Sequence, residues 1–121
     1  MTDNIRRHGL DMMEQVYGWP MKDGPGAHFA ATADHLFGRI WSRPGLSLRD
    51  RRLLLLGVIA AAGLADVASI QMDAALRNTE LDENQLREIV LFLAHYVGWP
   101  VAADIDAALD KIIDSAEPGL R

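Results

Sequence analysis

His95 and Glu88 are the two side chains whose types and spacing best suit proton transfer. Histidine ordinarily changes its charge near neutral pH, and His95 lies in an otherwise apolar segment that we expect to form a buried helix. Glu88 precedes it by seven residues. This spacing places both on nearly the same helix face, about 10 Å apart along the axis, which is too far for a hydrogen bond. The two could flank one substrate. The alternatives are a hydrogen-bonded interface histidine and an ion pair of Glu88 with Arg51 or Arg52.

A local cluster of arginines offers a place for a small anion. The cluster comprises Arg39, Arg43, Arg49, Arg51 and Arg52. A guanidinium can hold a carboxylate through two parallel hydrogen bonds, so Arg43 or Arg39 could bind an acidic substrate. His35 and Trp41 lie close to them in the sequence. Alternatively, Arg43 caps helix carbonyl groups or forms an ion pair between subunits, because it stands in a connector beside Pro44.

The composition argues against several classes of protein. The chain has no cysteine, which excludes disulfides, thiolate metal sites and thiol redox chemistry. Its formal net charge of -5 argues against a nucleic-acid partner, which would favour a basic face. The four histidines show no His-x-x-x-His pair, so we expect no metal site. We find no targeting segment or membrane span, and therefore expect a cytoplasmic protein.

Hydrophobic periodicity predicts an all-α protein of about six helices and no strand. The expected segments are residues 2–17, 26–40, 47–63, 64–78, 81–97 and a sixth helix from residue 101. Gly9 weakens the first helix, and Gly-Trp-Pro at residues 18–20 and 98–100 ends the first and the fifth helix. We expect one compact domain, with an N-terminal helix and loop over residues 1–26 and the main helical part over residues 27–121.

The segment 47–63 should form a central helix that the other helices wrap. Ser47 and Asp50 have the spacing of a capping pair at its start. After Arg52 the segment is apolar on every face, and a helix of that kind is buried on every face. The apolar run is shorter than the roughly 18 residues that a membrane span needs. Because 50% of the residues are hydrophobic, we also expect other subunits to cover part of this surface.

Several motifs, in order along the chain, resemble those of the carboxymuconolactone decarboxylase family. They lie at residues 37–46, 49–51, 61–63, 75–76, 86–90 and 96–102. The most specific are the Trp-Ser-Arg-Pro-Gly-Leu block of residues 41–46 and the Tyr-x-Gly-x-Pro block of residues 96–100. The resemblance extends over about residues 28–115. It implies an all-α fold of the alkyl hydroperoxidase D type and ring-like homo-oligomers, trimers or hexamers.

The resemblance also implies an activity and a set of site residues. The family's decarboxylase branch acts without a cofactor on a lactone of aromatic-compound catabolism. By this resemblance His95 would donate a proton, Glu88 and Gln71 would orient or polarise the substrate, and an arginine would hold its carboxylate. The expected binding residues are Arg43, Arg51, Trp41, His35 and Tyr96. The sister branch reduces peroxides with a Cys-x-x-Cys pair, and the lack of cysteine excludes that route.

The chain departs from the decarboxylase pattern at three positions. Gln71 and Phe92 stand where or near where that branch carries histidines, and Arg52 stands where it often carries glutamate. Glutamine can donate a hydrogen bond but cannot shuttle protons, and Gln71 could instead be a polar residue on a solvated face. Two hypotheses follow. The first is a cofactor-independent decarboxylase that acts on a small carboxylated unsaturated lactone or a related cyclic acid. The second is a non-catalytic oligomeric binding or scaffold protein.

Overall fold

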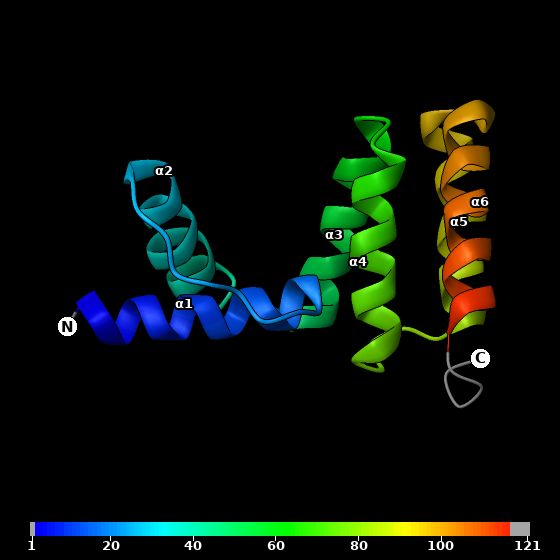
Figure 1. Ribbon diagram of the computed structural model, residues 1–121. Coiled ribbons are helices and arrows are strands. Elements are labelled where there is room, and N and C mark those ends of the chain that lie inside the picture. The colour runs from blue at the N-terminus through cyan, green and yellow to red at the C-terminus, as the bar shows by residue number, and fades with distance from the viewer. Residues whose placement is uncertain (1, 117–121) are drawn as a thin grey trace. The chain divides into compact units, whose positions relative to one another are not determined.

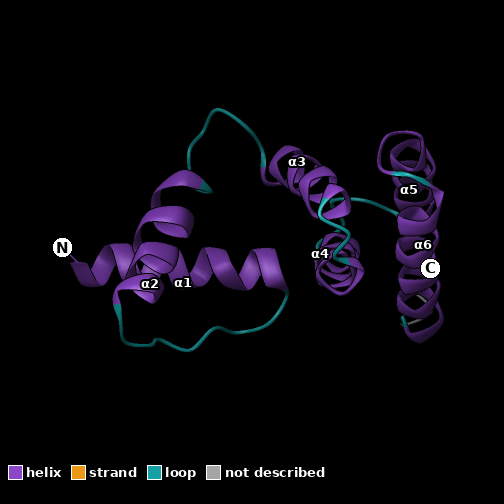
Figure 2. Cartoon of the chain, turned by 90° about the horizontal axis from the view of Figure 1, so that it is seen from above, coloured by secondary structure: helices purple, strands orange, loops and turns teal. Residues whose placement is uncertain are grey.

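The computed structural model describes residues 2–116, and within them every regular element is a helix (Figure 1). The elements are α1 (Thr2–Tyr17), α2 (Ala27–Ala30), η1 (Ala31–Ile40), α3 (Leu48–Ala61), α4 (Ala65–Arg77), α5 (Glu83–Val97) and α6 (Trp99–Ser115). Since η1 continues α2 without a break, these elements amount to the six predicted helices. The all-α class is therefore confirmed (Figure 2). The oligomeric state and the division at residue 26 stay predictions.

The chain divides into two compact units that meet between Arg51 and Arg52, and each is described by itself. In the first unit, α1 packs against η1. Gly9 is the residue that permits this contact, because a Cβ at this position would lie 1.8 Å from the carbonyl oxygen of Ala33. The sequence suggested that Gly9 merely weakens α1. The structure shows that it allows two helix backbones to approach closely.

The segment predicted as one helix over residues 26–40 has two geometries. One α-helical turn, α2, passes into a π-helix of ten residues, η1. Ala33 and Phe37 are buried in the first core, together with Leu10, Met13 and Val16 of α1. Arg6 of α1 forms ion pairs with Asp34 of η1, at 2.6 Å, and with Asp23 of the loop before α2, at 2.5 Å. These contacts connect α1 to both η1 and the loop.

The core of the second unit is built from α3, α4, α5 and α6. Its buried side chains include Leu56, Met72, Leu86 and Leu109, one from each of these helices. Figures 1 and 2 both show α5 and α6 side by side, and α6 also packs against α4. No described helix is long and apolar enough to cross a membrane.

The central helix is not buried on all its faces within one chain. On α3, Leu56 and Ile59 are buried, whereas Leu54 and Val58 are 64% and 66% exposed. The prediction of complete burial was therefore wrong for the single chain. The apolar faces of α3 exceed what the remaining helices of one chain cover. The start of α3 agrees with its prediction, because Ser47 Oγ accepts a hydrogen bond from the backbone N–H of Asp50 at 3.0 Å.

Helix α5 begins and ends as its sequence predicts. Asp82 and Gln85 form both hydrogen bonds of a capping box, and Gly98 ends the helix with a φ of 99° that other residues rarely adopt. Burial differs from the prediction, which placed two apolar faces of this helix in the interior. Leu86 and Val90 are buried, but the second face is exposed. This exposed face comprises Leu91, Phe92 and Tyr96.

Candidate functional site

Three of the predicted site residues line one open pocket on the exposed face of α5. Glu88, His95 and Tyr96 surround a volume of about 450 Å³ together with Leu91 and Phe92. We call it the α5 pocket. All five side chains come from a single helix, at the spacing that places residues on one face. The polar groups present are one carboxylate, one imidazole and one phenol, which together can donate and accept protons and hydrogen bonds.

His95 has a defined orientation in this pocket. Its Nδ1 lies 2.9 Å from the carbonyl oxygen of Leu91, one turn earlier. Because a carbonyl oxygen can only accept, Nδ1 carries the proton in this contact and Nε2 is the nitrogen that exchanges a proton with a ligand. The imidazole also contacts the Trp99 ring edge-on, with centroids 5.2 Å apart. His95 is exposed, which corrects the expectation that it sits on a buried helix.

Glu88 is an exposed carboxylate shared by two pockets. Besides the α5 pocket, it borders a second pocket of about 390 Å³ that Leu53, Ile89, Phe92 and Leu93 also line. Within the chain, Arg52 pairs with Glu80 and Arg51 donates to the carbonyl oxygen of Arg43, and an ion pair of Glu88 across a subunit interface stays a prediction. Within the described residues Glu88 forms no ion pair, and its exposed side chain lines both pockets.

Gln71 lies apart from the α5 pocket, in a buried polar network of the second unit. Gln71 is 2% exposed, which rules out the alternative of a solvated face. Its side-chain oxygen accepts a hydrogen bond from Arg52 Nη1 at 2.7 Å. Arg52 also donates Nε and Nη2 to the two carboxylate oxygens of Glu80, at 2.9 and 2.8 Å. The sequence interpretation missed Glu80, because its partner lies 28 residues away and on another element.

The remaining predicted binding residues belong to the first unit. Arg51 donates Nη1 to the carbonyl oxygens of Arg43, at 3.0 Å, and Leu46. It therefore holds the connector that precedes α3. Trp41 stacks on Phe37 with ring centroids 5.8 Å apart. Arg43 and His35 are exposed. Their predicted roles stay predictions.

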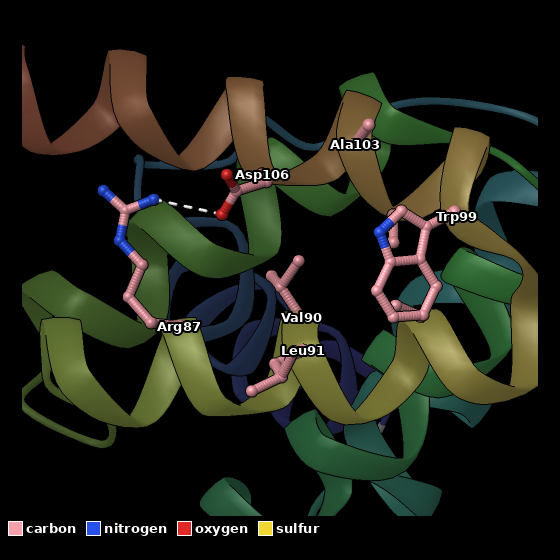
Figure 3. Close-up of a pocket in the computed structure, with 8 residues that line it drawn as sticks. Arg87, Val90, Leu91, Trp99, Ala103 and Asp106 are labelled. Atoms are coloured by element: carbon pink, nitrogen blue, oxygen red, sulfur yellow. Dashed lines mark hydrogen bonds and ion pairs between the residues drawn. The ribbon is translucent and has the colours of Figure 1, made fainter.

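A third pocket, which the sequence interpretation did not anticipate, lies between α5 and α6 (Figure 3). Arg87 of α5 contacts Asp106 at 3.1 Å and Asp110 at 2.7 Å, both on α6. These carboxylates, Asp110 first, raise the pKa of Arg87 above its ordinary value. The available signal was the four-residue spacing of Asp106 and Asp110 on the helix after Arg87. In the described part of the chain, no cluster of three or more histidine or acidic side chains could hold a metal ion.

The model of the carboxymuconolactone decarboxylase family matches residues 26–111, most of the chain. The chain belongs to this family. Two curated proteins are similar to it. One is a 4-carboxymuconolactone decarboxylase of Acinetobacter baylyi, 32% identical over 54% of this chain and 48% of its own length. The other is the nitrosuccinic acid decarboxylase npaB of Metarhizium robertsii, 32% identical over 64% of this chain and 54% of its own length.

The chain thus spans about half the length of these two decarboxylases. No solved structure shows a significant match to it. The contact between Arg52 and Gln71 also involves two of the positions at which the sequence departs from the decarboxylase pattern. The two residues stand at positions where the resemblance leads us to expect glutamate and histidine, and they contact each other directly. The two residues that differ from the expected glutamate and histidine are therefore direct neighbours, a guanidinium that donates to a neutral amide.

Proposed function

We propose that this protein is a cofactor-independent decarboxylase of a small carboxylic acid, with the reaction centred on the α5 pocket. The observation that carries the proposal is the convergence of Glu88, His95 and Tyr96 on one pocket, in a chain of the carboxymuconolactone decarboxylase family. The names of both similar proteins support the class of reaction. The substrate we favour is a carboxylated unsaturated lactone or a related cyclic acid, and nitrosuccinic acid is an acyclic alternative.

The reaction breaks the bond between the carboxylate carbon and the rest of the substrate. Carbon dioxide leaves, and the bonding electron pair stays on the substrate, where a neighbouring electron-withdrawing group delocalises it. The protonated imidazole of His95 then donates its Nε2 proton to the substrate carbon, and solvent returns a proton to the imidazole. The hydrogen bond from Nδ1 to the carbonyl of Leu91 fixes the ring so that Nε2 is the reacting atom.

Tyr96 and Glu88 have separate roles in this proposal. The phenol of Tyr96 donates a hydrogen bond to the oxygen on which negative charge develops, since it lies in the same pocket as His95. The carboxylate of Glu88 faces the substrate's own carboxylate. Their repulsion is relieved when the substrate loses its charge as carbon dioxide, so the interaction favours the transition state. Gln71 has no role at the α5 pocket in this proposal, because it is buried, does not line that pocket and accepts a hydrogen bond from Arg52.

The test is turnover of 4-carboxymuconolactone and of nitrosuccinic acid, followed by absorbance and by release of carbon dioxide. We expect turnover with at least one of them and a loss of at least tenfold in kcat/KM for His95→Ala, about 1.4 kcal/mol of barrier. His28→Ala is the matched control, because His28 is also an exposed helix histidine but lies outside the pocket. Its kcat/KM should equal that of the wild type.

Two results would contradict the proposal in different ways. Equal turnover in the wild type and His95→Ala would keep the decarboxylase and remove His95 from its mechanism. Absence of turnover together with absence of saturable binding of either acid would favour the scaffold hypothesis, for which the exposed apolar face of α5 is the structural argument.

A further inference from the structure

The Gly-Trp-Pro motif at residues 98–100 ends α5 and starts α6 at the same point of the chain. Gly98 is both the C-terminal cap of α5 and the N-terminal cap of α6, with a φ of 99° that other residues rarely adopt. Pro100 lies in the first turn of α6, where its fixed φ suits a helix. Since α6 then packs against α5, Trp99 at the start of α6 lies beside the last turn of α5.

The indole of Trp99 has contacts on both helices. Figure 3 shows it reaching from the start of α6 toward α5, where it lines the α5–α6 pocket together with Leu91 and Ala94. The same indole meets the imidazole of His95, with ring centroids 5.2 Å apart and ring planes at 77°. Edge-to-face contact of this kind is a preferred arrangement of aromatic pairs. The indole therefore forms a wall beside the imidazole.

This wall bears on the orientation of the His95 ring. The contact of Nδ1 with the carbonyl oxygen of Leu91, at 2.9 Å, requires that Nδ1 faces back along α5. His95 is exposed, so water competes for that single hydrogen bond, and its net contribution to holding the ring is small. The edge-on contact with Trp99 depends on the angle between the two rings, and it opposes rotation of the imidazole away from Leu91.

We propose that Trp99 is a positioning residue, which holds the His95 imidazole with Nδ1 on the Leu91 carbonyl and with Nε2 as the nitrogen that meets a ligand. Trp99 does not line the α5 pocket, so it acts through His95 and not on a substrate. Loss of the aromatic contact should lower the population of this ring orientation about two- to tenfold. The consequence for catalysis rests on the proposed function, whereas the orientation of the ring does not.

The test follows the imidazole nitrogens by NMR in the intact protein at about pH 9, where histidine is ordinarily uncharged. Nitrogen chemical shifts distinguish a ring protonated on Nδ1 from one protonated on Nε2, and the hydrogen bond of the ring decides between the two forms. In the wild type we expect mainly the Nδ1–H form of His95, and a nuclear Overhauser effect between the ring protons of His95 and Trp99.

Two variants at position 99 separate the aromatic contact from simple packing. Trp99→Leu keeps an apolar side chain against α5 but removes the ring, and the ratio of the Nδ1–H to the Nε2–H form of His95 should fall about two- to tenfold. Trp99→Phe keeps an aromatic ring and should restore most of the wild-type ratio. Trp99 is 60% exposed, so we expect both variants to fold.

The first unit supplies the matched control. Trp19 belongs to the other Gly-Trp-Pro motif and stacks on Tyr17, with ring centroids 5.7 Å apart. Trp19→Leu should leave the ratio of the two His95 forms unchanged. In Trp99→Leu, the forms of His28 and His35, which also belong to the first unit, should not change.

The kinetic test compares kcat with KM. Under the proposed function, Trp99→Leu should lower kcat about two- to tenfold at unchanged KM, since the indole orients the proton donor and does not border the substrate pocket. Trp99→Phe should restore most of kcat. A wild type without turnover would refute the proposed function alone, because the NMR measurement needs no substrate and still decides whether Trp99 orients His95.

Three results would overturn the proposal. The first is a wild type in which His95 shows no nuclear Overhauser effect to Trp99 or is mainly in the Nε2–H form, and this result needs no variant to fold. The second is an equal ratio of the two forms in the wild type and Trp99→Leu. The third is an unchanged kcat in Trp99→Leu when His95→Ala impairs turnover, which would mean that the orientation of His95 does not depend on Trp99 during the reaction.

Discussion

Arg52 Nη1 and Gln71 Oε1 lie 2.7 Å apart in the interior of the second unit, so the α3 and α4 helices are joined by a polar contact at their buried faces. The same guanidinium forms a two-point ion pair with Glu80, in the segment after α4. The Arg52 side chain is 0% exposed and that of Glu80 is 8% exposed. A charge this deeply buried requires its partner, and that requirement leads to the first prediction.

Replacement of Glu80 by alanine should strongly destabilise the protein. The change removes the carboxylate from a buried guanidinium, for which we expect a loss of about 3–5 kcal/mol in the free energy of unfolding. Urea denaturation measures it. Asp73→Ala is the control, because Asp73 pairs with Arg77 at the surface and should cost less than about 1 kcal/mol. Similar losses in both variants would show that burial of the Arg52–Glu80 pair does not matter.

Replacing either of two helix glycines by alanine should change the free energy of unfolding, and the two changes should have opposite signs. Gly9→Ala places a methyl group against the carbonyl oxygen of Ala33, and we expect it to lower the free energy of unfolding by about 1–3 kcal/mol or more. Gly57 of α3 has open space at its Cβ position. Gly57→Ala should therefore raise the free energy of unfolding by about 1 kcal/mol, through helix propensity. Denaturant midpoints compare the two, and a stabilised Gly9→Ala variant would contradict the close contact of α1 with η1.

The ion pair between Arg6 and Asp34 should make stability depend on pH. Hydrogen bonding to Arg6 lowers the pKa of Asp34 below its ordinary value. A carboxylate whose pKa is lower in the folded state stabilises the protein above its ordinary, unfolded pKa. That contribution is lost as the pH falls through the lowered value. Asp34→Asn should therefore melt at a lower temperature than the wild type at pH 7, and the difference should shrink on acidification below about pH 4.

The control for this prediction is Asp104→Asn. Asp104 is an exposed aspartate of α6 that forms no ion pair within the described residues. Its substitution should leave the melting temperature unchanged at both pH values. A constant difference between the wild type and Asp34→Asn at pH 7 and pH 3 would mean that the ion pair does not contribute through its charge.

The exposed apolar face of α3 should be an interface between copies of the chain. Leu54 and Val58 are one turn apart and both are mostly exposed, which is costly for leucine and valine in water. We expect light scattering of the wild type to give a trimer or a hexamer. The double variant Leu54→Glu with Val58→Glu should have a lower mass, and the surface change Lys111→Glu should not. A monomeric wild type at micromolar concentration would contradict this prediction.

The positions of the helices and their ends could be predicted from the sequence because they depend on local chemistry. Periodic apolar residues define helices such as α5, and its limits are set by the capping pair of Asp82 and Gln85 and by Gly98. The α-helix α1 was predicted with the bounds that the structure shows. The change from α-helix to π-helix at Ala31 was missed, because both geometries place similar apolar residues on the inner face.

The sequence by itself determined which residue types are present for chemistry and placed Glu88, His95 and Tyr96 on one helix, since their spacing of seven and eight residues follows the helical repeat. Only the tertiary structure decided which apolar faces are covered. Periodicity shows that α3 and α5 have two apolar faces but not which of them meets a neighbour. The tertiary structure also decided that Arg52 contacts both Gln71 and Glu80, because contacts over 19 and 28 residues depend on how separate helices pack.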